Sequence, residues 1–180
     1  MRIITGSARG RRLVSPEGYD VRPTTDKVKE SLFNIIQFDL DGALFCDLFA
    51  GSGQIGLEAV SRGAAKAVFV ESSKKSLEVI KTNIDLCKFS DSCTAVFSDV
   101  FVYLNSLKED FDFIFMDPPY NKQMCDKALA ILAAKVSDNT TIICETQISE
   151  VLPEKIGELK LIKTYDYSSI KLSVFRKVNQ

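Results

Sequence analysis

The chain has 180 residues, of which 46% are hydrophobic, and its formal net charge is −1. This length and composition suit a single domain with a substantial core. The sequence contains no histidine, which excludes Ser-His-Asp and Cys-His nucleophilic machinery and histidine-based metal sites, so we expect no bound metal.

The N-terminal end, residues 1–38, predicts a small appendage ahead of the core. RIIT (2–5) and RRLV (11–14) are short strand-like runs around a glycine-rich turn, a pattern typical of a β-hairpin. The following SPEGYDVRPTTD is punctuated by proline and glycine, and Thr24 or Thr25 can cap the helix that comes next. That helix carries one apolar stripe, formed by Val28, Leu32, Ile35 and Ile36.

Residues 39–180 alternate between strand and helix patterns. Five short runs rich in Phe, Val and Ile are typical of parallel strands buried on both faces: LFCDLF (44–49), AVFVE (67–71), TAVF (94–97), FDFIFMD (111–117) and TTIICE (140–145). Helical patterns lie between them at 55–62, 74–88 and 122–135. LKLIKTY (159–165) and IKLSV (170–174) alternate in polarity, which predicts antiparallel strands. The fold class is therefore a doubly wound, Rossmann-like α/β sheet, mostly parallel, with an antiparallel C-terminal finish.

A glycine-rich turn follows the first core strand. In CDLFAGSGQIG, the glycines Gly51, Gly53 and Gly56 spell G-x-G-x-x-G, the fingerprint of a dinucleotide-binding turn. Glu71 comes about twenty residues after Gly51, where an acid can accept bonds from ribose hydroxyls. NAD enzymes place an acid at the same distance, so these two features leave the cofactor open.

Carboxylates decide between the cofactors. The first strand carries Asp47, the second ends in Glu71, the third is followed by Asp99 and the fourth ends in Asp117. Parallel strands bring these groups to one edge of the sheet, where a pyrophosphate would be repelled and the ammonium and sulfonium of S-adenosylmethionine attracted. We assign Asp47 to the methionine ammonium, Glu71 to the ribose and Asp99 to the adenine amino group. The alternative for Asp47 and Asp99 is that they cap helices or turns.

The predicted cofactor-binding set combines the turn with the ends of the neighbouring strands. It consists of Asp47, Phe49, Ala50, Gly51, Ser52, Gly53, Glu71, Ser72, Asp99 and Val100.

The motif DPPY, at 117–120, carries the predicted chemistry. Pro118 and Pro119 fix the backbone after a buried strand, so that a neighbouring carbonyl can point into the cleft. Together with Asp117 it would accept both protons of an exocyclic amine, which aims the nitrogen lone pair at the sulfonium methyl, while Tyr120 stacks on the base. Direct displacement needs no strong general base and suits a chain without histidine. The alternative is that Pro-Pro only ends a strand and Tyr120 packs at its edge.

These motifs resemble those of amino-directed S-adenosylmethionine methyltransferases: DLFAGSGQIGLEAVSRGA, FVESS, SDV and FDFIFMDPPY. RIITGSARGRRL followed by VRPTTDKVKESLFNII resembles more closely one bacterial family, the RsmD-type enzymes that methylate a guanine N2 in small-subunit (16S) ribosomal RNA. The resemblance runs nearly end to end and implies that the substrate is ribosomal RNA within an assembled or assembling ribosomal particle. The chain departs from the family near its end, where Tyr167-Ser168-Ser169-Ile170 stands in place of Tyr-Gly-Asp-Thr.

The basic charge of the N-terminus fits an RNA partner. Residues 1–15 contain four arginines and no acid. A guanine held in an active site needs cations on the surrounding phosphates, and we assign that role to Arg9, Arg11, Arg12, Arg22 and Thr24. The alternative is an ordinary solvated basic tail.

Three other functions fit parts of the sequence. The same motifs could methylate an adenine in DNA or RNA, or a protein side-chain amide. A nicotinamide-dependent oxidoreductase explains the glycines and Glu71 but gives DPPY no role. A binding module that has lost catalysis is disfavoured by the intact DPPY.

The remaining composition indicates the cellular compartment. Five cysteines lie scattered among apolar neighbours without a C-x-x-C pair, as core thiols do in a reducing compartment. No apolar run approaches the length of a membrane span, and MRIITGSARGRR lacks the apolar stretch of a signal peptide. We therefore expect a cytoplasmic protein without membrane contact.

Overall fold

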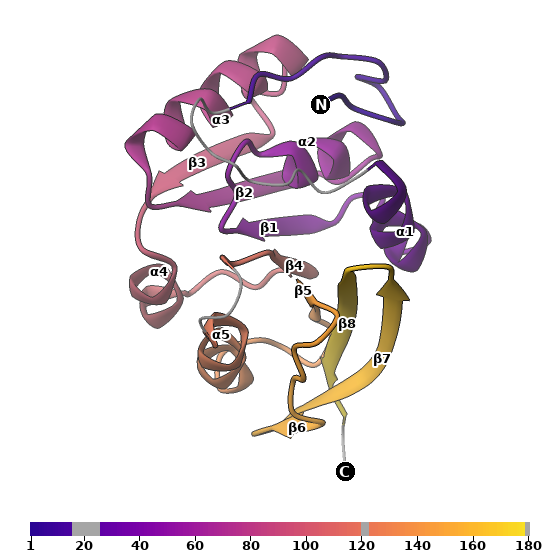
Figure 1. Ribbon diagram of the computed structural model, residues 1–180. Helices are drawn as coiled ribbons and strands as arrows, with labels where there is room; N and C mark the ends of the chain where they lie inside the picture. The colour runs from indigo at the N-terminus through magenta and orange to yellow at the C-terminus, as the bar shows by residue number, and fades with distance from the viewer. Residues whose placement is uncertain (16–25, 120–122, 179–180) are drawn as a thin grey trace.

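A computed structural model of the chain describes residues 1–15, 26–119 and 123–178 (Figure 1). Its helices are α1 (Asp26–Ile36), α2 (Gln54–Ser61), α3 (Lys74–Cys87), α4 (Val100–Ser106) and α5 (Met124–Ala133). Its strands are β1 (Leu44–Leu48), β2 (Lys66–Glu71), β3 (Cys93–Phe97), β4 (Phe113–Met116), β5 (Thr141–Gln147), β6 (Lys155–Ile156), β7 (Leu159–Tyr167) and β8 (Ile170–Lys177).

All described strands join one sheet in the order β3-β2-β1-β4-β5-β8-β7-β6. β1 to β5 pair in parallel, and β8, β7 and β6 add antiparallel strands at one edge. The predicted fold class is confirmed. The strand order reverses between β1 and β4, and in open α/β sheets ligands bind outside the carboxyl ends of the strands at such a switch point.

The sheet is covered on both faces, which gives three layers (Figure 1). Phe45 of β1 lies beside Phe113 of β4 and packs with Phe33 of α1, on the face that α2 and α3 also cover. The next residue along each strand, Cys46 and Ile114, faces α4 and α5 on the opposite side. Side chains alternate between the faces of a strand, so burial of both faces requires the continuous apolar runs seen in the sequence.

The first residues of the chain pack on this core. Ile3 is fully buried and Leu13 is buried, both in the cluster that holds α1, α2 and the sheet. We call residues 1–15 the N-terminal arm. Figure 1 shows the arm beside α2 and α3.

The arm forms a short hairpin-like turn in place of two full strands. Its limbs are joined by an antiparallel bridge between Arg2 and Arg12 and by backbone hydrogen bonds such as that from the Ile3 N–H to the Arg11 carbonyl, at 3.0 Å. The backbone N–H groups of Ile4 and Thr5 donate to the carboxylate of Glu58 in α2, at 2.8 Å and 3.0 Å. Since those donors are used on α2, they are not available for a ladder within the arm.

Two short elements escape the sequence prediction, α4 and β6. α4 spans seven residues, and Val102 in it is 64% exposed, so its apolar residues form no single stripe. β6 has only two residues, too few for an alternating pattern. Thr24 and Thr25, the predicted caps of α1, lie outside the described residues.

Candidate active site

The glycine turn joins β1 to α2 with a strongly curved backbone. Phe49, Gly51 and Gly53 all have positive φ values, of 61°, 56° and 75°. A Cβ on Gly51 would have a single neighbour within 4 Å, the Phe49 carbonyl oxygen at 3.9 Å, so the space in front of it is open. Gly56 differs, because a Cβ there would lie 2.4 Å from Cε1 of Phe69. Gly51 therefore leaves room for a ligand, whereas Gly56 lets α2 pack against β2.

The four predicted carboxylates follow adjacent strands. Asp99, Glu71, Asp47 and Asp117 stand in or just after β3, β2, β1 and β4, which are neighbours in that order. The pKa of Asp47 is raised well above its ordinary value, chiefly by burial and further by the charges of Asp117 and Glu71. Asp47 therefore lies near both of the other carboxylates, at the switch point of the sheet.

Glu71 holds the glycine turn in place. One carboxylate oxygen accepts from the Gly51 N–H at 2.9 Å, and the other accepts from the Ser73 N–H at 2.7 Å. The side chain is partly exposed, and neighbouring Ser72 is exposed. Each carboxylate oxygen has a second acceptor position, so Glu71 can brace the turn and still face a ligand.

Asp47 and Asp99 both act as backbone acceptors at helix starts. Buried Asp47 accepts from the Gly56 N–H of α2 at 3.0 Å. Exposed Asp99 caps α4 by accepting from the N–H groups of Phe101 and Val102, at 2.8 Å and 3.1 Å. The capping alternative thus accounts for the hydrogen bonds of one carboxylate oxygen in each of the two residues. Val100, the first residue of α4 and also a predicted cofactor-binding residue, is buried.

Asp117 follows β4 directly and is partly exposed, while Pro118 is buried and Pro119 exposed. Burial raises the pKa of Asp117 to about 7. The predicted partner Tyr120 lies outside the described residues. The remaining residues of the turn, Ala50 and Ser52, are buried.

The N-terminal arm runs along α2. Near its tip, the Ala8 N–H donates to the Ser61 hydroxyl at 3.0 Å, at the C-terminal end of α2. Its first residue reaches the other end, where the Ser52 hydroxyl contacts the Met1 sulfur at 3.1 Å. Arg9, Arg11 and Arg12 are exposed. Arg22 and Thr24 lie outside the described residues.

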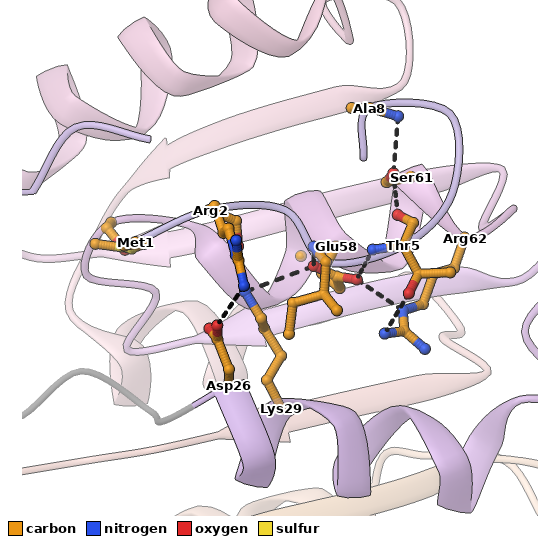
Figure 2. Close-up of polar contacts among 12 residues, drawn as sticks. Met1, Arg2, Thr5, Ala8, Asp26, Lys29, Glu58, Ser61 and Arg62 are labelled. Atoms are coloured by element: carbon orange, nitrogen blue, oxygen red, sulfur yellow. Dashed lines mark hydrogen bonds and ion pairs between the residues drawn. The ribbon is translucent and has the colours of Figure 1, made fainter. Parts of the chain in front are cut away.

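Buried ionic groups fasten the arm, and the sequence prediction missed them (Figure 2). Glu58 and Lys29 are fully buried, with 3.5 Å between the carboxylate and the ammonium, and Arg62 donates to Glu58 at 2.8 Å. Lys29 also donates to the Arg2 carbonyl at 2.6 Å. Lys29 follows the buried Val28 in α1, and Glu58 lies between the buried Leu57 and Ala59 in α2. These positions among core residues are the sequence feature that could have predicted the burial of both charges.

The described part of the chain shows neither a membrane-spanning helix nor a cluster of metal ligands. None of its helices is long and apolar enough to cross a membrane. It contains no group of three or more Cys, Asp or Glu side chains placed to hold a metal ion.

The fold and the site together define a class. The site lies at the switch point of the sheet and combines an open glycine turn, an acid at the end of β2 and Asp-Pro-Pro after β4. This combination defines a Rossmann-like, S-adenosylmethionine-dependent methyltransferase. The sequence profile of a family described as Conserved hypothetical protein 95 matches residues 1–176. The chain belongs to this family, which is that of the RsmD methyltransferases.

Individual relatives agree with this placement. The Bacillus subtilis protein YlbH is 34% identical, over 98% of this chain and 99% of its own length. Ribosomal RNA small subunit methyltransferase D of Escherichia coli is 33% identical, over 85% of this chain and 78% of its own. The solved structure of yhhF from Escherichia coli matches with a TM-score of 0.87 and 30% identity, over 100% of this chain and 99% of that one.

Proposed function

We propose that this protein transfers a methyl group from S-adenosylmethionine to the N2 amine of a guanine in small-subunit ribosomal RNA. The supporting observation is the position of Asp47, Glu71 and Asp117 at the carboxyl ends of adjacent strands, together with a glycine turn that has open space at Gly51. The name of the Escherichia coli relative supplies the class of RNA. We further propose that the substrate is an assembled or assembling ribosomal particle in the cytoplasm.

The turn and the carboxylates would hold the cofactor. Gly51 allows the ligand to approach the backbone, and Glu71, which already fixes the Gly51 N–H, would accept the ribose hydroxyls. Asp47 and Asp99 would attract the methionine ammonium and the adenine amino group. Carboxylates gathered at the carboxyl ends of adjacent strands fit a cationic ligand, which they attract, whereas they would repel the pyrophosphate of NAD.

Asp117 would orient the target amine. When bound, S-adenosylmethionine supplies an electrophilic methyl on a sulfonium. Asp117 and a carbonyl of the Pro118-Pro119 segment would accept the two amine protons, and Tyr120 would stack on the guanine. The raised pKa of Asp117 places the carboxyl near half protonation at neutral pH. A cationic neighbour favours the carboxylate form, so cofactor binding would prepare Asp117 as an acceptor.

The cofactor and catalytic assignments are tested with Asp117→Ala. Calorimetry should show binding of S-adenosylmethionine to the wild type and the variant with similar affinity, and no comparable binding of NAD. The variant should lose most turnover on small-subunit particles, and mass spectrometry of their nucleosides should no longer show N2-methylguanosine. The matched control is Asp91→Ala, an exposed acid in the turn before β3. Full turnover of Asp117→Ala, tight NAD binding, or methylation of adenine would each refute the proposal.

The arm is tested by charge removal. Arg9, Arg11 and Arg12 should contact phosphates around the guanine, and their joint replacement by serine should weaken particle binding while S-adenosylmethionine binding stays intact. If each neutralises one phosphate, the slope of log affinity against log salt falls by about 2, from roughly 0.7 for each contact. A control with serine at Lys155, Lys160 and Arg176, exposed cations of β6, β7 and β8, removes equal charge far along the sheet. Equal slopes in both variants would contradict an RNA role for the arm.

A further inference from the structure

Asn83 of α3 is a fully buried amide that joins two distant segments. Its nitrogen donates to the Ser52 carbonyl at 2.9 Å and to the Val14 carbonyl at 3.0 Å. Its oxygen accepts from the Val14 N–H at 2.8 Å. Both amide hydrogens and the oxygen are therefore used, so the side chain has one satisfied orientation.

The two segments are those to which the proposed function gives different ligands. Ser52 stands between Gly51 and Gly53 in the turn proposed to hold the cofactor. Val14 lies in the last stretch of the arm, after Arg11 and Arg12. The Ser52 hydroxyl, which contacts the Met1 sulfur, gives a second link between the same turn and the other end of the arm.

We propose that Asn83 is a positioning residue that couples the two binding sites, so that cofactor and RNA each strengthen binding of the other. The inference rests on the proposed function. A ligand that orders the glycine turn fixes the Ser52 carbonyl, and through Asn83 it fixes both backbone groups of Val14. The arm then loses less conformational freedom when it binds RNA, so RNA binds more tightly to the protein that already holds the cofactor. This is positive coupling without a large structural change. Coupling is reciprocal, and values of about 5-fold or more are common.

A purely structural role for Asn83 predicts something different. In that case its loss would lower the melting temperature and weaken both ligands, but the factor by which one ligand improves the other would stay the same. The coupling factor therefore separates positioning from support of the fold.

The test measures the affinity of S-adenosylhomocysteine by equilibrium dialysis, with and without saturating small-subunit particles from cells that lack the enzyme. We expect the wild type to bind it at least about 5-fold more tightly in the presence of particles. Asn83→Asp keeps the acceptor for the Val14 N–H but loses both donated bonds, so the factor should fall to near one. The control, Asn34→Asp, makes the same chemical change on the exposed side of α1 and should keep the wild-type factor.

Hydrogen exchange on the wild type tests the same link without a variant. S-adenosylhomocysteine should slow exchange of the Val14 amide as well as the amides of the glycine turn. A wild-type factor near one, an unchanged factor in Asn83→Asp, or protection that stops at the turn would overturn the coupling. In each of those cases both ligands still bind, so the proposed function stands. Failure of either ligand to bind the wild type would instead refute the proposed function and the coupling with it.

Discussion

Replacing Glu58 by glutamine should strongly destabilise the protein. The buried carboxylate accepts from three donors, the N–H groups of Ile4 and Thr5 and the Arg62 guanidinium at 2.8 Å, and it forms an ion pair with the Lys29 ammonium at 3.5 Å. Glutamine keeps the shape of the side chain but turns an NH2 group toward some of these donors. It also removes the negative charge that faces two cations, of which Lys29 is fully buried.

The magnitude follows from the burial of the pair. Removing one partner of a buried ion pair costs about 3–5 kcal/mol, because the other charge remains unpaired. For a chain of this size each kcal/mol lowers Tm by about 2–4 °C, so Glu58→Gln should lower it by about 6–20 °C. Lys29→Met should cost less, about 1–3 kcal/mol, because Glu58 keeps Arg62 and two backbone donors. Burial already lowers the pKa of Lys29, against the opposing pull of Glu58.

Urea unfolding followed by circular dichroism measures these effects. The double variant of Glu58→Gln with Lys29→Met should cost clearly less than the sum of the two single variants, because the unpaired cation is gone. Glu78→Gln, which breaks the exposed pair with Lys81, is the matched control and should leave the unfolding midpoint nearly unchanged. Additive costs within about 0.5 kcal/mol would show that Lys29 and Glu58 do not stabilise each other and would refute the reasoning.

Three further predictions follow from the site and the C-terminal turn. Because Asp117 is proposed to accept one amine proton in its carboxylate form, kcat/KM for S-adenosylmethionine should rise with pH through about 7. A midpoint near 4, or the same profile in Asp117→Asn, would contradict this role. Gly56→Ala should lower Tm through its clash with Phe69, whereas Gly51→Ala should chiefly weaken S-adenosylhomocysteine in calorimetry, since its Cβ enters the open space of the turn. Ser168→Gly should raise the urea midpoint, because Ser168 has a φ of 37°, and Ser168→Ala, which keeps the Cβ, should not.

Most helices and strands of the fold could be predicted from local hydrophobic patterns in the sequence. The buried strands of the parallel sheet are continuous apolar runs because both of their faces are covered, and α3 shows a clear stripe of Leu77, Ile80 and Ile84. α4 could not be found in this way, since seven residues are too few to repeat a helical pattern and the apolar Val102 among them is exposed. The sequence predicts elements best where each is long enough to repeat its pattern.

The site was predictable where a residue acts from a fixed place in the topology. Asp47, Glu71, Asp99 and Asp117 could be named because the carboxyl ends of parallel strands meet at one edge. Contacts between distant segments gave no such signal. Asn83 binds residues 31 and 69 positions away in the chain. Its place on the apolar stripe of α3, beside Ile84, indicates burial, but the sequence does not say which backbone groups it binds.

The departure at Tyr167 to Ile170 lies in the two-residue turn between β7 and β8. Ser168 there takes a left-handed backbone conformation, at the position where the family resemblance expects glycine. Serine accepts that conformation at a cost, and the turn still closes, because Tyr167 pairs with Ile170 across it. The substitution is therefore expected to lower the stability of the turn without preventing the pairing of β7 and β8.

α2 explains why the cofactor turn and the arm belong to one functional unit. Its first turn receives Asp47 at Gly56, next to the glycine turn, and its last turn holds the arm through Glu58 and Ser61. The helix has eight residues, which at 1.5 Å per residue makes it about 12 Å long. The tip of the arm, with Arg9, is thus held about that far from the glycine turn by a rigid element. Under the proposed function we therefore expect Arg9 to act on phosphates beyond the target nucleotide, and the chemical step to depend on Asp117.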